Sequence, residues 1–81
     1  MKHQSKLEKV RWLLADLCEK QGFCSALHEL ERFESLADEG AEAFANALLI
    51  VEGLKPDEHK SAHRDVFAFV SERFQRWSSD A

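Results

Sequence analysis

The chain has 81 residues, of which 44% are hydrophobic and 32% charged, and it contains one proline and three glycines. This composition excludes the disordered and fibrous classes, and the absence of tyrosine together with sparse β-branching argues against strands. The net charge is −4 without a basic stripe, and no stretch matches a signal peptide or a membrane span. We therefore expect a single helical domain over residues 1–81, located in the cytoplasm.

A first helix is predicted from Lys6 to Gln21. Ser5 followed by Glu8 forms a capping-box pattern at its start, and Gly22 is typical of a helix end. One face of this helix should be buried, because apolar residues recur there at helical spacing. These residues are Leu7, Val10, Leu14 and Leu17.

The middle of the chain carries an unbroken heptad pattern of apolar or small residues. Its members are Phe23, Ala26, Leu30, Phe33, Ala37, Gly40, Phe44, Ala47, Val51 and Leu54. Because a loop would normally shift the phase, and the phase passes through Gly40 unchanged, we favour one long helix that is continuous or merely bent there. The predicted fold is all-α, with antiparallel helical hairpins formed by three helices, the central one long.

The alternative is a break near Gly40, which would make four helices. Glycine inside a helix costs ~1 kcal/mol relative to alanine. Ser35 with Asp38 also offers a second capping-box pattern that could restart a helix.

The last helix is predicted from Pro56 to Trp77. Gly53 indicates the end of the preceding helix, and proline is favoured in a first helical turn. Its expected buried line consists of His63, Phe67, Val70, Phe74 and Trp77.

A continuous central helix leaves the segment 41–51 covered on one side only. This segment is apolar on all sides, and a helix of that kind must be buried all round. We therefore predict a homodimer with Phe44, Leu48, Leu49 and Ile50 at its interface. A kink at Gly40 would instead let a four-helix bundle cover the same residues within one chain.

Four acidic residues of the central region recur at helical spacing, at Glu31, Glu34, Asp38 and Glu42. Neighbouring side chains in such a stripe lie ~5–6 Å apart, which is comparable to the phosphate spacing of nucleic acid. The stripe could therefore bind the basic, nucleic-acid-binding surface of another protein. A solvated helix face that only keeps the protein soluble would explain the same residues.

Two aromatic residues fall outside the expected apolar stripes. Trp12 lies about 160° from the centre of the first helix's stripe, and Phe69 is about 120° off the axis of the last one. Exposed aromatic side chains are common anchors of protein interfaces, so both are candidate partner-binding residues. The alternative is that one or both fold over an adjacent helix as a small satellite cluster.

The two cysteines, Cys18 and Cys24, are expected to be reduced thiols. Together with His28, or with His59 and His63, they could serve a metal- or thiol-dependent sensor, because thiolate and imidazole groups bind zinc. The spacing matches no standard zinc module, so we expect no metal and no cofactor. Buried Cys18, half-buried Cys24 and surface histidines are the simpler interpretation.

The sequence favours a non-enzymatic function. The carboxylates lie on a solvated helix without a feature that would raise their pKa, and no catalytic grouping or phosphate loop is present. The segment 18–31 superficially resembles a helix-turn-helix, but its acidic residues would repel phosphates, so direct nucleic-acid binding is not expected.

We therefore predict a small acidic regulator or inhibitor that occludes a larger, basic partner protein. Glu31, Glu34, Asp38 and Glu42 would steer the partner, and Trp12 would anchor it. Small acidic helical proteins that phages and plasmids encode to block nucleic-acid-handling machinery are of this type, by analogy alone.

Overall fold

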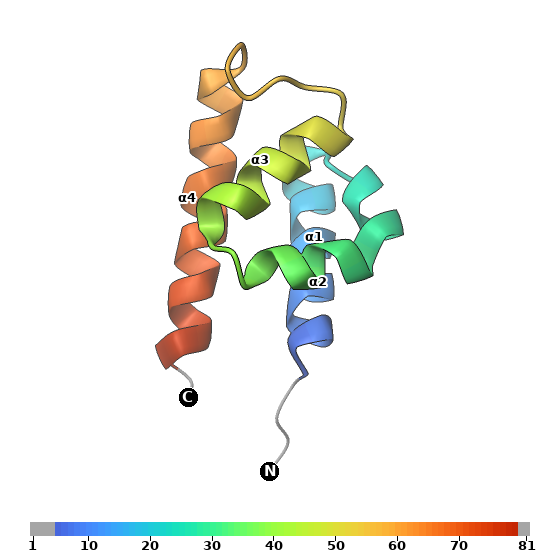
Figure 1. Ribbon diagram of the computed structural model, residues 1–81, viewed down its shortest axis with the longest axis vertical. Coiled ribbons are helices and arrows are strands. Elements are labelled where there is room, and N and C mark those ends of the chain that lie inside the picture. The colour runs from blue at the N-terminus through green and yellow to red at the C-terminus, as the bar shows by residue number, and fades with distance from the viewer. Residues whose placement is uncertain (1–4, 80–81) are drawn as a thin grey trace.

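The computed structural model describes residues 5–79, and these form an all-α fold with four α-helices, one short 3-10 helix and no strand (Figure 1). The elements in chain order are α1 (Lys6–Gln21), η1 (Ser25–Glu29), α2 (Leu30–Ala37), α3 (Ala41–Val51) and α4 (Lys60–Ser79). None of the helices in this part of the chain combines the length and the hydropathy needed to cross a membrane. Residues 1–4 and 80–81 of the predicted domain lie outside the described residues.

The predicted bounds of α1 are confirmed together with both caps. The Ser5 hydroxyl accepts a hydrogen bond from the Glu8 backbone N–H at 3.1 Å. At the other end, Gly22 has a φ of 78° and its N–H donates to the Cys18 carbonyl at 3.1 Å. These caps satisfy backbone groups that a helix leaves unpaired at its ends.

The prediction of one continuous central helix is wrong, and the alternative of a break near Gly40 that makes four helices is confirmed, because the chain breaks between α2 and α3. The N–H of Glu39 bonds to the Leu36 carbonyl at 2.9 Å in a closing turn. Gly40 then adopts φ 110° and ψ 169°, a conformation almost restricted to glycine. The break turns α3 away from the direction of α2 (Figure 1).

The heptad phase survives the break because α2 and α3 bury the same heptad positions against one core. Phe33 of α2 and Phe44 of α3 are both fully buried, and their rings meet edge to face at 5.1 Å. An unbroken heptad phase therefore indicates that α2 and α3 share one core, and it does not require a single helix.

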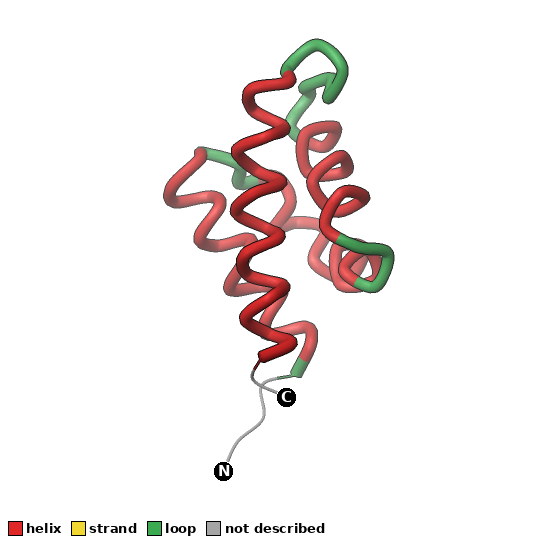
Figure 2. Tube along the Cα trace, turned by 90° about the vertical axis from the view of Figure 1, so that its left-hand side faces the viewer, coloured by secondary structure: helices red, strands yellow, loops and turns green. Residues whose placement is uncertain are grey.

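The long helices α1 and α4 run in opposite directions, and α2 and α3 lie across one side of this pair (Figure 1). An ion pair between Arg73 and Asp16, at 2.7 Å, joins α4 to α1. Figure 2 shows α4 running along most of the longest dimension of the part of the molecule that residues 5–79 form.

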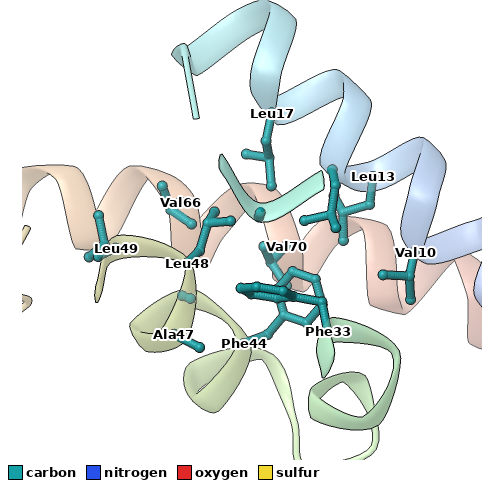
Figure 3. Packing of buried hydrophobic residues seen from close by; sticks show 13 residues of the cluster. Val10, Leu13, Leu17, Phe33, Phe44, Ala47, Leu48, Leu49, Val66 and Val70 are labelled. Atoms are coloured by element: carbon teal, nitrogen blue, oxygen red, sulfur yellow. The ribbon is translucent and has the colours of Figure 1, made fainter. Parts of the chain in front are cut away.

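Side chains of all four α-helices and of η1 form the core (Figure 3). The Phe44 ring lies at its centre, in edge-to-face contact with Phe33 on one side and with Phe74 at 5.5 Å on the other. The largest fully buried residues are Phe33, Phe44, Leu13, Leu14, Leu17, Leu48, Leu49, Val10, Val66 and Val70.

This packing corrects the predicted dimer interface. Phe44, Leu48 and Leu49 are 0% exposed within one chain, because the break at Gly40 folds α3 against α4 and η1. They are therefore not available to a second protomer. Of the four predicted interface residues only Ile50 stays accessible, with 58% of its surface exposed.

The last helix begins later than predicted. Residues 56–58 form a turn, and α4 starts at Lys60. The expected buried line also needs correction, since Phe67 is 39% exposed whereas Val66 beside it is fully buried. The rest of that line packs inward, with Val70 buried and Phe74 and Trp77 partly buried against the core.

Candidate partner-binding surfaces

Trp12 projects from the outer side of α1. The inner side of this helix consists of fully buried residues, namely Val10, Leu13, Leu14 and Leu17. Trp12 lies nearly opposite them around the helix, and it is 55% exposed. Its exposure agrees with the position that the sequence pattern assigns to it.

Phe69 differs from Trp12, because it is half-buried and packs against the core. The guanidinium of Arg73 lies 5.2 Å from the centre of its ring, and the ammonium of Lys20 lies 6.0 Å away. Arg73 is also held by Asp16. Phe69 therefore belongs to a satellite cluster between α1 and α4, and its ring is not presented to solvent as an anchor.

The acidic stripe does not form one continuous row. Glu31 and Glu34 belong to α2, Asp38 caps the end of that helix, and Glu42 lies in the first turn of α3 beyond the break. Asp38 forms an ion pair with Lys6 of α1, which neutralises part of its charge. Glu31 instead borders a hollow of about 470 Å³ beside Leu7 and His28.

Trp12 and the acidic residues face different sides of the molecule. The buried side of α1 faces α2 and η1, so its outer side, with Trp12, points away from them. Glu31 and Glu42 are exposed on the helices that cover the opposite side.

A groove of about 770 Å³, which the sequence patterns do not predict, lies between α3, the following loop and α4. One wall is the outer side of α3, where Glu42, Asn46 and Ile50 recur at one-turn spacing. The other side comes from the loop residues 53–57 and from His63 of α4. The sequence gives no separate signal for Ile50, because Leu48 and Leu49 are also large apolar residues outside the heptad register, and both are fully buried.

The loop shapes this groove through a tight helix end. Gly53 has a φ of 82°, which lets the chain reverse, and the N–H of Leu54 bonds back to the Leu49 carbonyl at 2.9 Å. A second turn follows, in which the His59 N–H donates to the Lys55 carbonyl at 2.9 Å. The loop therefore arches from the end of α3 to the start of α4 (Figure 1).

The prediction of two free thiols is wrong, because Cys18 and Cys24 form a disulfide. It joins the last turn of α1 to the segment before η1. With both sulfur atoms bonded to each other, they cannot act as thiolate ligands beside His28. Within residues 5–79, no three cysteine, histidine or acidic side chains gather closely enough to hold a metal ion.

Removing the disulfide should lower stability. Its loop of seven residues predicts a loss of about 2 kcal/mol, or roughly 10 °C in melting temperature for a domain of this size. We expect a reductant to cause this shift in the wild type and to leave the double variant Cys18→Ser with Cys24→Ser unaffected, as followed by circular dichroism. Two titratable thiols per unreduced chain would contradict the disulfide.

Comparison of the chain with protein-family models, with curated proteins and with solved structures found no match. The kind of protein is therefore described from the structure of this chain alone. Residues 5–79 form a small all-α fold that has an exposed tryptophan and an acidic, partly apolar groove.

Proposed function

We propose that this chain is a non-enzymatic protein-binding domain that regulates or inhibits a larger partner with a basic surface. The observation that carries the proposal is Trp12, whose side chain is 55% exposed in the middle of a well-capped helix. Tryptophan is the residue type most enriched among side chains that dominate binding energy at interfaces. Burying it against a partner would remove its apolar ring from water.

Charge supports a basic partner. The chain carries a net charge of −4, and the acidic residues of α2 and α3 lie on the side of the molecule opposite Trp12. A partner that contacts both sides must enclose the domain in a cleft, which a protein larger than this chain can provide. A cleft that binds nucleic acid has the required positive charge, and this domain would occlude it.

The proposal predicts that Trp12→Ala accelerates dissociation from the partner at least roughly tenfold, since it removes a buried aromatic anchor. The partner is captured from a lysate of the source cells on immobilised wild-type protein, and its dissociation rate is then measured with purified components. Arg11→Ala, an exposed neighbour on the same helix, serves as the control. Equal dissociation rates for wild type and Trp12→Ala would refute the role of Trp12.

A thiol-dependent sensor is a second candidate function, favoured by the disulfide between Cys18 and Cys24. Cys24 is exposed, so thiols in solution can reach it. In the cytoplasm, which we retain as the proposed location, most disulfides are transient and regulatory. Partner affinity that changes on reduction in the wild type, and not in the cysteine-free variant, would favour this second function.

A further inference from the structure

The groove between α3 and α4 combines an exposed apolar wall with polar groups that lack partners. Ile50 is 58% exposed in it, and the half-buried Leu54 and Pro56 continue the apolar surface. A ligand with an aliphatic side chain would cover them.

The uncompensated charge at the groove is negative. Glu42 and Asp57 line it, and neither forms an ion pair or a side-chain hydrogen bond with the other residues in the range 5–79. The one cation in the lining, Lys55, faces the carboxylate of Glu58 at 3.9 Å. The groove therefore attracts a cationic ligand and repels an anionic one.

His63 adds an unsatisfied hydrogen-bonding group. Its Nε2 atom is buried and has no hydrogen-bond partner within the described part of the chain. The ring is held in place by stacking on Phe67, with the ring centres 6.1 Å apart and the planes 10° from parallel. Because this atom is closed off from solvent, a ligand in the groove would contact the His63 ring and not Nε2.

We propose that this groove binds a segment of the partner in which a lysine or arginine lies next to an aliphatic side chain. The aliphatic side chain covers Ile50, and the cation pairs with a carboxylate of the groove lining, Glu42 or Asp57. This assignment rests on the proposed function, and it places recognition of the basic partner in the groove.

The test uses two fluorescent peptides that form amphipathic helices, one built from lysine and leucine and the other from glutamate and leucine. We expect the wild-type protein to bind the lysine peptide and not the glutamate peptide in an anisotropy titration. Ile50→Ser should weaken binding roughly tenfold, as loss of an apolar anchor does. The double variant Glu42→Gln with Asp57→Asn should also bind more weakly and lose most of the salt dependence.

A matched control separates this site from general charge attraction. Glu8→Gln with Glu19→Gln removes the same charge from exposed positions of α1, outside the groove lining. It should change affinity by less than about twofold, because these charges do not line the groove and attraction between exposed charges is screened by salt. Equal weakening by both double variants, or equal binding of both peptides, would overturn the groove assignment, provided that circular dichroism shows all variants folded.

Two further measurements separate the groove from its alternatives. If the protein alone gains mass with concentration and Ile50→Ser abolishes that gain, the occupant is a second copy, which overturns the assignment. If the groove variants retain the captured partner while Trp12→Ala loses it, the groove assignment fails and the proposed function stands. If Trp12→Ala retains the partner as well, both fail.

Discussion

Replacing Phe44 by alanine is expected to unfold most of the protein at 25 °C. Phe44 is fully buried, and its ring contacts Phe33 and Phe74 edge to face at 5.1 and 5.5 Å. Removing a core phenylalanine costs ~3–5 kcal/mol, through lost burial and the cavity that remains. The hydrophobic core of a domain of this length rarely supplies more than ~3–5 kcal/mol, so little stability would be left.

Urea unfolding followed by circular dichroism measures this effect. Phe67→Ala is the matched control, because the same side chain is 39% exposed at that position of α4. We expect the control to lose less than about 1 kcal/mol, since most of the cost of truncation comes from full burial. Similar losses for the two variants would show that Phe44 does not lie at the centre of the core.

Gly40→Ala is expected to lower the free energy of unfolding by about 1–3 kcal/mol, because alanine is strained at φ 110° and ψ 169°. No atom lies within 4 Å of the added Cβ, so the loss comes from the backbone conformation alone. Inside a continuous helix the same substitution would raise stability by about 1 kcal/mol. The sign of the change therefore separates a broken chain from a bent helix.

The measurement is again urea unfolding, with Glu39→Ala as a control at the exposed neighbouring position. This control should change stability by no more than about 0.5 kcal/mol, as most surface substitutions do. A gain in stability for Gly40→Ala would indicate that the central helix is continuous. The predicted dimer would then follow again from the uncovered segment 41–51.

The heptad pattern predicted part of the core, but it omitted the fully buried Leu48 and Leu49, and it could not predict how the chain connects its helices. Phe33 and Phe44 lie in the same register, and both are buried. Periodicity records which side of a helix faces apolar surroundings, and two short helices against one core satisfy it as well as one long helix. The φ of Gly40 was the missing information, since glycine is compatible with both arrangements.

The candidate sites were predicted unevenly for a similar reason. The exposure of Trp12 follows from its angle on a single helix whose caps are readable in the sequence. The groove depends on a fold-back that brings His63 near Ile50, and the disulfide depends on the chain path after Gly22. Neither the groove nor the disulfide can be predicted from the spacing of residues along a single helix.

NMR mapping of the contact between the protein and the lysine–leucine peptide shows whether the acidic groove is the surface that recognises a basic segment. Backbone ¹H–¹⁵N spectra are recorded during the titration. We expect the largest shifts on the outer side of α3, in residues 53–57 and at His63, with little change around Trp12. Shifts centred on Trp12, or spread evenly over all exposed acidic residues, would contradict this expectation.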